Sequence, residues 1–153
     1  MINAPTLNYF ATLEIEVAKP QEIGKSVHGE RRLIPILGGK VSGQNWQGKV
    51  LSGGADYQLI ATPRLALLDA HYTIETDQGE CIYVHNSAIR VASPEVTQQI
   101  KKGEPVDPQQ VYFRCSPKFE TSAERFQWIT ERLFIGVGVR KPTLVELTLF
   151  EVG

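Results

Sequence analysis

The stretch LLDAHYTIET, residues 67–76, alternates between two kinds of side chain. Successive residues of a strand point to opposite faces, so Asp69 and His71 share a polar face and the apolar residues between them share the other. A carboxylate in an enclosed cavity is suited to general acid–base chemistry, whereas in bulk water it is an ordinary surface group. Whether Asp69 and His71 can take part in catalysis therefore depends on whether the polar face points into a cavity or into bulk water.

Mixed faces recur in three later stretches, CIYVH, VYFRCS and LFIGVGVRK. They combine aromatic, charged and small side chains, among them Tyr83, Tyr112, Arg114, Gly136 and Gly138. Glycines inside a strand leave space for a ligand or another backbone, so the pattern predicts a pocket beside Tyr112 and Arg114. A buried Arg114 would need a carboxylate partner, and the candidates are Asp56, Asp69 and Glu120. The alternative is a solvated outer face, where such an ion pair contributes little stability.

Short alternating segments separated by Gly, Pro, Asp or Asn fill most of the chain and are typical of an antiparallel all-β domain. About eight or nine such segments predict a barrel or a sandwich. Residues 77–80, DQGE, have the composition of a tight hairpin turn, so we expect the strands on either side to pair directly. In residues 7–17 the odd-numbered positions form an apolar face, which indicates a strand with one buried side.

Two short helices are expected between the strands. In SPEVTQQIKKG, Ser93 can cap a helix, Pro94 suits its first position and Gly103 suits the residue just past its end. In FETSAERFQWITERL, Thr121 and Glu124 have the spacing of a capping box.

Composition excludes several classes of function. The 153 residues fit a single domain spanning 1–153, and the 42% of hydrophobic residues are enough for a core. A net charge of −1 provides no broad basic field, so nucleic acid is not an expected partner. No stretch resembles a spanning helix or a signal peptide, so we expect no membrane association and a cytoplasmic location.

No cofactor or metal is indicated by the sequence. Phosphate-binding glycine loops, nucleophile elbows and zinc-protease motifs are all missing from the chain. Cys81 and Cys115 lack metal-binding spacing and are expected to be buried, reduced thiols. His71 and His85 could face each other across the hairpin, but no carboxylate-plus-histidine spacing specifies a metal.

Five stretches in order resemble the domain of unknown function 3237 family, also called uncharacterised protein family 0311: GERRLIPILGGKVSG, VLSGGADYQ, LLDAHYTIETDQGECIYV, YFRCSPKFET and FQWITERLFIGVGVRK. The resemblance runs from Gly29 to Val152 and implies a calycin-like antiparallel β-barrel, whose interior can hold one small ligand. It implies that the recurring polar positions of the family correspond here to Asp56, Asp69, Arg114, Glu120 and Trp128. The chain departs from the family in residues 86–90, NSAIR, where a turn with Gly is usual.

Together these inferences predict a small-molecule-binding barrel. The expected catalytic residues are Asp56, Asp69 and Glu120, and the expected ligand-binding residues are Tyr83, Tyr112, Arg114 and Trp128. An enzyme of this kind would transfer protons without a cofactor, as an isomerase, a lyase or a lactone hydrolase acting on a cyclic or aromatic metabolite. The alternatives are a non-catalytic carrier or ligand sensor, and a structural or interaction domain with a solid interior. Exposed edge strands would also allow a homodimer.

Overall fold

Strand pairing runs around the molecule until it returns to the first strand. The computed structural model describes residues 1–153 and contains ten strands in one sheet. The strands are β1 (Leu7–Val17), β2 (Gln21–Ser26), β3 (Gly29–Gly43), β4 (Trp46–Val50), β5 (Ala55–Ile60), β6 (Leu65–Thr76), β7 (Cys81–Val91), β8 (Tyr112–Thr121), β9 (Phe134–Arg140) and β10 (Leu144–Val152).

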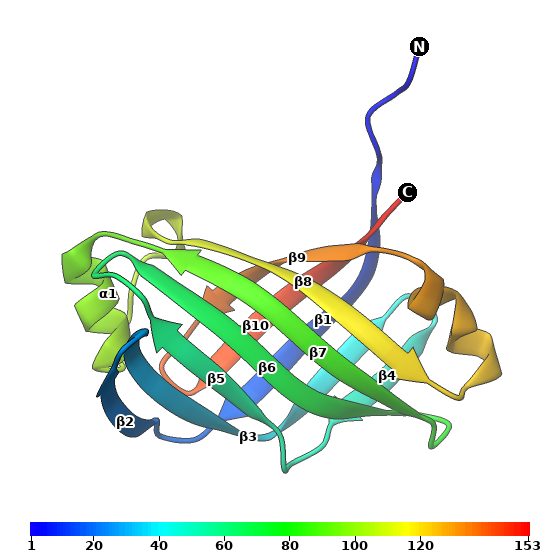
Figure 1. The fold of residues 1–153 in the computed structure, drawn as a ribbon. Helices are drawn as coiled ribbons and strands as arrows, with labels where there is room; N and C mark the ends of the chain where they lie inside the picture. The colour runs from blue at the N-terminus through cyan, green and yellow to red at the C-terminus, as the bar shows by residue number, and fades with distance from the viewer.

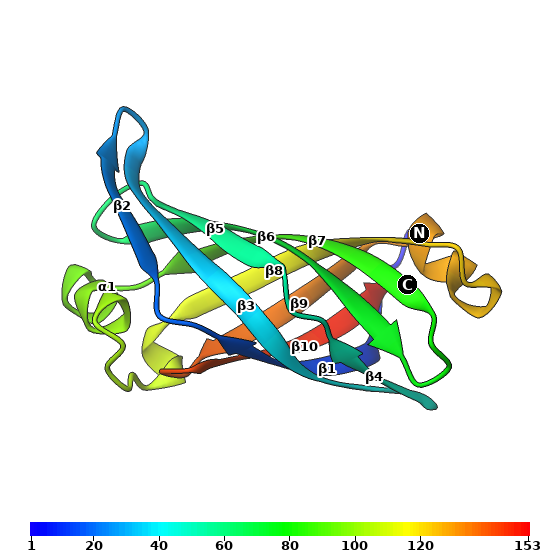
Figure 2. The same ribbon diagram turned by 90° about the horizontal axis from the view of Figure 1, so that it is seen from below.

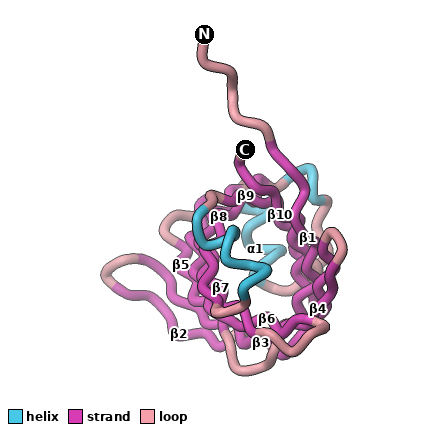
Figure 3. The backbone as a smooth tube through the Cα atoms, turned by 90° about the vertical axis from the view of Figure 1, so that its right-hand side faces the viewer, coloured by secondary structure: helices cyan, strands magenta, loops and turns pink.

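The sheet closes because β1 pairs with β10 on one side and with β3 on the other, always antiparallel. The short strands β4 and β5 follow one another between β3 and β6, so the closed barrel has eight strand positions. Figure 1 shows the strands wrapping around a common axis, and Figure 3 shows them as a ring in a view along that axis. The β2–β3 hairpin projects from the wall (Figure 2). The predicted all-β barrel is confirmed, and residues 86–90 continue β7 and form no turn.

Two glycines make the closure and the main hairpin possible. At the β1–β3 seam Gly39 has φ 151°, and a Cβ there would lie 2.1 Å from the carbonyl oxygen of Glu14. Only glycine allows the two backbones to approach this closely. Gly79 has φ 80° in the turn between β6 and β7, as the sequence DQGE predicts. The two strands then pair along their whole length, from Leu65 with Val91 to Glu75 with Cys81.

The barrel interior is mainly apolar, and one end of it is filled by aromatic rings. Phe10, Trp46, Phe119, Phe126 and Phe134 are buried there, with ring centroids of neighbours 5.0 to 5.7 Å apart. These rings belong to one core cluster of 25 buried residues that extends along the barrel. The expected strand 7–17 joins this core, but a bulge after Tyr9 changes the register, so that Phe10 is buried and Tyr9 is exposed.

Helical segments lie at both ends of the barrel (Figures 1 and 2). Helix α1 (Pro94–Lys101) begins as predicted, because the Ser93 side chain accepts a hydrogen bond from the Val96 amide at 3.1 Å. The buried Arg32 ties this helix to the barrel by donating to the Lys101 carbonyl oxygen. None of the helices combines the length and the apolar composition that crossing a bilayer would require.

The second predicted helix is a 3₁₀-helix, η2 (Glu124–Glu131), and its capping box does not form. The Thr121 hydroxyl accepts a hydrogen bond from the Ala123 amide and donates one to the Cys81 carbonyl oxygen. Because these bonds occupy the hydroxyl, it does not cap the helix. A third short segment, η1 (Pro108–Gln110), precedes β8. Segment η2 covers the aromatic end of the barrel through Phe126 and Ile129, which are both buried.

Candidate ligand site in the barrel

A cavity of about 50 Å³ lies in the half of the barrel away from the aromatic cluster. A water molecule needs about 10–15 Å³ of such a volume, so the cavity has room for several waters or for part of a small ligand. Its wall combines apolar side chains with a few polar ones: Ile15, Val17, Ile34, Ile36, Asp56, Gln58, Leu68, Ala70, Tyr72, Asn86, Ala88, Arg90, Phe113, Arg140, Val145 and Leu147. An apolar pocket with a few polar groups is the usual form of a small-molecule site.

Four buried polar atoms on the residues of this wall have no hydrogen-bond partner within the protein. They are Gln58 Oε1, Tyr72 Oη, Asn86 Oδ1 and Arg90 Nη2. Buried polar groups in folded proteins are nearly always paired, because an unpaired one loses its hydration without compensation. A molecule inside the cavity would supply the missing partners.

Asp56 is the acidic residue of the cavity, and it is held in place from two sides. Gln58 Nε2 donates to its Oδ2 at 2.7 Å, and the backbone amide of Asp69 donates to its Oδ1 at 3.1 Å. Burial raises the pKa of Asp56 above the ordinary value of 3.8, although the bond from Gln58 and the charge of Arg90 oppose this shift. A carboxyl group with a raised pKa is better suited to exchange protons near neutral pH.

Positive charge exceeds negative charge around the cavity. Arg90 is almost fully buried, and burial lowers its pKa to about 10, which still leaves the guanidinium charged at neutral pH. Arg140 also lines the cavity, and burial lowers its pKa as well. Two guanidinium groups therefore share the cavity with one carboxyl group, a balance that favours an electron-rich or anionic oxygen in a ligand.

A second hollow adjoins the cavity at the helix α1 end. It has a volume of about 310 Å³ and is shared by the α1 end and the segments that follow β1 and β9. Val17 and Arg140 line both spaces, so these two side chains lie between the hollow and the interior cavity. Lys19, Lys101 and Lys102 line it together with Glu22, and Lys101 is paired with Glu30.

Of the seven predicted site residues, the structure places only Asp56 in the cavity. Asp69, Tyr83, Tyr112, Arg114 and Glu120 are all exposed on the outside of the barrel. In β6, β7 and β8 the residues that alternate with them are turned inward, so the expected orientation of these faces is wrong. The solvated outer face, stated above as the alternative, is what these three strands show.

The remaining features of the predicted pocket do not line the cavity. Arg114 stacks on the Tyr112 ring, with 4.8 Å between guanidinium carbon and centroid, and has no carboxylate partner. Trp128 is 42% exposed on η2, where it contacts Phe10 at the far end of the barrel. Gly136 and Gly138 do face the interior, but the space beside them is filled.

Neighbouring side chains occupy the volume that the two glycines leave. A Cβ at Gly138 would lie 2.7 Å from the Phe113 ring, and a Cβ at Gly136 would lie 2.7 Å from Cys115 Sγ. These glycines therefore admit core side chains and provide no room for a ligand. Cys115 is buried as expected, whereas Cys81 is exposed, contrary to expectation.

Sequence reasoning missed Gln58, Tyr72, Asn86 and Arg90, whereas Arg140 belongs to the mixed face of LFIGVGVRK and does line the cavity. The available signal was a polar residue on an otherwise apolar face. Asn86 and Arg90 alternate with exposed residues of β7 in the same register as the buried Ile82 and Val84, and Ile89 is 42% exposed beside Arg90. Polar residues on the inward face at the end of one strand distinguish a polar-lined interior from a solvated outer face.

The comparisons with known proteins agree with this architecture. Residues 5–152 match the family model "Protein of unknown function (DUF3237)". A "UPF0311 protein" of Rhodopseudomonas palustris strain TIE-1 is 43% identical over 150 residues, which cover 97% of this chain and 98% of that protein.

Solved structures extend the similarity to the backbone. The conserved protein of unknown function RPA1785 from Rhodopseudomonas palustris has a TM-score of 0.93 at 38% identity, covering 99% of this chain and 100% of that one. A "beta-barrel like protein" from Acinetobacter baumannii has a TM-score of 0.87 at 32% identity, covering 100% and 99%. A structure described as an enzyme from Penicillium herquei has a TM-score of 0.74, covering 100% and 98%, and its 19% identity shows a shared fold alone. The chain belongs to the DUF3237 family.

Proposed function

We propose that the protein binds a small organic molecule inside the barrel, between the aromatic cluster and helix α1. The observation that carries the proposal is the convergence of four unpaired buried polar atoms on one cavity. A solid structural barrel would gain stability by replacing these groups with apolar ones, because each unpaired group costs about 1–3 kcal/mol. Keeping them favours a binding role over a purely structural one.

The ligand is expected to carry both acceptor and donor groups around a small apolar body. Arg90 can donate only, so it would bind a carboxylate, carbonyl or enolate oxygen. The carbonyl oxygens of Gln58 and Asn86 accept, and they suit a hydroxyl or amine of the ligand. The aliphatic wall of Ile34, Leu68 and their neighbours would hold the apolar part.

The enzyme form of this proposal assigns a general acid–base role to Asp56. Proton abstraction from carbon next to a carbonyl group creates an oxyanion, which the Arg90 guanidinium would stabilise. Isomerisation and lyase reactions on a cyclic or aromatic metabolite use such a step and need no cofactor. In lactone hydrolysis Asp56 would instead take a proton from the attacking water, and Arg90 would stabilise the tetrahedral oxyanion that forms before the ring C–O bond breaks. The shared fold of the Penicillium herquei enzyme is compatible with this form.

A non-catalytic carrier or sensor is the second candidate, and it would bind the same class of ligand as the enzyme. Asp56 distinguishes the two forms. In a carrier, Asp56→Asn changes affinity by the loss of one hydrogen bond. In an enzyme, the same change retains ligand binding and abolishes turnover of that ligand.

The proposal is tested by a thermal-shift screen with small carboxylates, phenols, lactones and cyclic ketones. A ligand at about 100 times its dissociation constant adds about 2.7 kcal/mol to the stability of the protein that binds it. The expected result is a shift for one chemical class, lost in Arg90→Met and kept in Arg114→Met, whose guanidinium lies outside. A shift that Arg114→Met removes and Arg90→Met keeps would place the ligand on the outer wall and contradict the proposal.

A further inference from the structure

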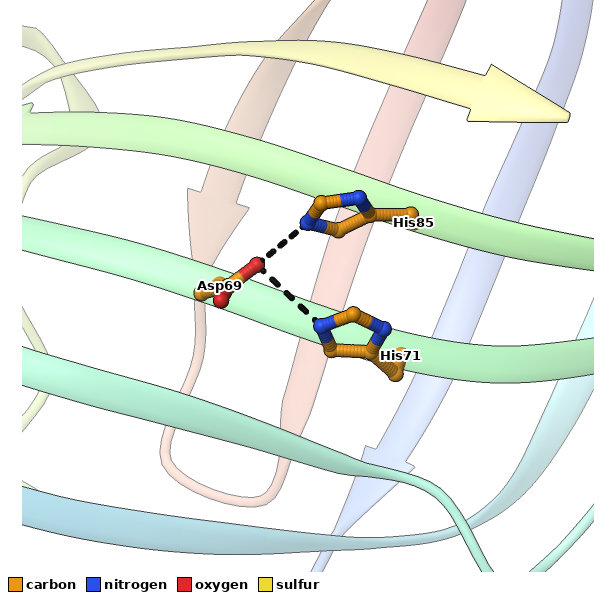
Figure 4. A group of neighbouring side chains, drawn as sticks. All are labelled: Asp69, His71 and His85. Atoms are coloured by element: carbon orange, nitrogen blue, oxygen red, sulfur yellow. Dashed lines mark hydrogen bonds and ion pairs between the residues drawn. The ribbon is translucent and has the colours of Figure 1, made fainter.

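We propose that Asp69, His71 and His85 form a binding site for a first-row transition metal ion on the outer wall of the barrel. The three side chains gather on neighbouring strands, Asp69 and His71 on β6 and His85 on β7 (Figure 4). Each offers one ligand atom, and these atoms lie within 4.8 Å of one another. This site is separate from the interior cavity, because these side chains point away from it.

The two imidazoles converge on one carboxylate oxygen. His85 Nε2 lies 2.6 Å from Asp69 Oδ1, and His71 Nε2 lies 3.3 Å from the same atom. Ligand atoms of a tetrahedral zinc ion are about 3.3 Å apart, as follows from metal–ligand distances of about 2.0–2.1 Å. The distance from His71 Nε2 to Asp69 Oδ1 already has this value. A small rotation of the His85 side chain would lengthen the distance from its Nε2 to the same oxygen.

Backbone pairing fixes the two histidines before any ion binds. His71 and His85 are direct partners across β6 and β7, and their rings stack with centroids 4.3 Å apart and planes 14° apart. The pairing of the two strands over their whole length limits the motion of both residues. An ion that binds here therefore loses little free energy in ordering its ligands.

Tyr83 supplies the hydrogen bond that orients a metal-binding histidine. Its hydroxyl lies 2.6 Å from His71 Nδ1. A proton on Nδ1 donated to Tyr83 leaves the lone pair of Nε2 directed at the cluster, which is the usual arrangement around a bound metal. His85 has Nε2 on the same side, so both imidazoles offer the same nitrogen.

The donor set selects the class of ion. Two imidazoles and one carboxylate suit Zn²⁺ or Cu²⁺, whereas Mg²⁺ and Ca²⁺ require oxygen donors. Water would complete the coordination shell, because the three side chains are 35–53% exposed. A site with three protein ligands and open positions is also the form in which a metal can bind a further molecule.

The test titrates tag-free protein with Zn²⁺ by calorimetry and follows Cu²⁺ by electron paramagnetic resonance. The expected result is one ion per chain, with nitrogen hyperfine splitting from two imidazoles on copper. His71→Ala and His85→Ala should each weaken binding by at least roughly tenfold, and Tyr83→Phe by a smaller factor. Since these side chains are partly exposed, the variants are expected to fold, and urea unfolding verifies it.

Two matched variants control for other ligands on the surface. His28→Ala removes a histidine from the β2–β3 turn, and Cys81→Ser removes the exposed thiol. Both should bind zinc as the wild type does. Absence of a saturable single-ion isotherm, or equal zinc affinity in His71→Ala, His85→Ala and wild type, would overturn the proposal. A copper spectrum without two imidazole nitrogens would overturn it without recourse to variants.

Discussion

Gln58 donates a hydrogen bond of 2.7 Å from its side-chain amide to the carboxylate of Asp56, two residues away on the same face of β5. The carbonyl oxygen of that amide has no partner and belongs to the cavity wall. Gln58 thus connects the acidic residue of the interior to the space that a ligand would occupy. This connection makes the ionisation of Asp56 sensitive to what fills the barrel.

Asp56→Asn should remove a loss of stability that the wild type undergoes as pH rises. Burial raises the pKa of the folded carboxyl group above 3.8, so the folded state holds this proton more tightly than the unfolded state. The resulting stabilisation is complete below pH 3.8 and is lost as pH rises through the raised value. Urea unfolding of wild type and variant from pH 3 to 8 measures the difference.

The wild type and Asp56→Asn share all other carboxyl groups, so the contributions of those groups cancel in the difference between the two free energies of unfolding. We expect the free energy of unfolding of the wild type to fall relative to Asp56→Asn with rising pH. A wild type that gains stability relative to the variant over the same range would show that the carboxylate is stabilised by its surroundings.

Tyr72→Phe should not destabilise the unliganded protein. The Tyr72 hydroxyl is buried without a hydrogen-bond partner, so its removal avoids a desolvation penalty and is expected to raise the free energy of unfolding by about 0–1 kcal/mol. The same change should weaken any ligand found in the thermal-shift screen. Tyr112→Phe, on the outside, is the control and should alter neither quantity. A loss above about 2 kcal/mol in Tyr72→Phe would mean that the hydroxyl is paired.

Gly138→Ala should destabilise the barrel although it adds a single methyl group. A Cβ at Gly138 would lie 2.7 Å from the Phe113 ring, which is itself buried, so ring or strand must move. Overpacking of this kind costs about 1–3 kcal/mol. Ser87→Ala, at an exposed position of β7, provides the control. An unchanged urea midpoint in Gly138→Ala would indicate empty space beside this glycine, as the sequence alone suggests.

The two thiols should differ sharply in reactivity. Cys115 is buried in the core, and burial raises its pKa to about 11, so little thiolate is present at neutral pH. Cys81 is exposed at the start of β7. Mass spectrometry after brief maleimide treatment should find a single adduct on Cys81, with a second appearing only in denaturant. Rapid double labelling of the native protein would contradict the burial of Cys115.

The barrel could be predicted from the sequence because alternation and turn chemistry are local properties. Residues 77–80 specify a hairpin by their own conformational preferences, and Ser93 with Pro94 specifies a helix start in the same way. The register change at Tyr9 and the unused capping box at Thr121 arise from contacts with distant residues. The spacing of residue types along the chain does not predict such contacts.

The site could be predicted only in part, since alternation separates two faces of a strand without saying which one is turned inward. The more polar faces of β6 and β8, with Asp69 and Arg114, are predicted to face a pocket but are solvated. Asp56 is predicted as a carboxylate partner for Arg114 and from the family resemblance, and it lines the cavity because it lies on the inward face of β5. Asn86 and Arg90 also lie on an inward face, but the family resemblance places a turn at residues 86–90, where the structure has a continuous strand.

A crystal structure of the protein with the ligand that gives the largest thermal shift would test the interior site most directly. We predict the ligand inside the barrel, with an oxygen on Arg90 Nη2 and a second polar group on Gln58 or Asn86. A ligand bound only outside, with Arg90 and Tyr72 still unpaired around an unfilled interior, would contradict the proposed function.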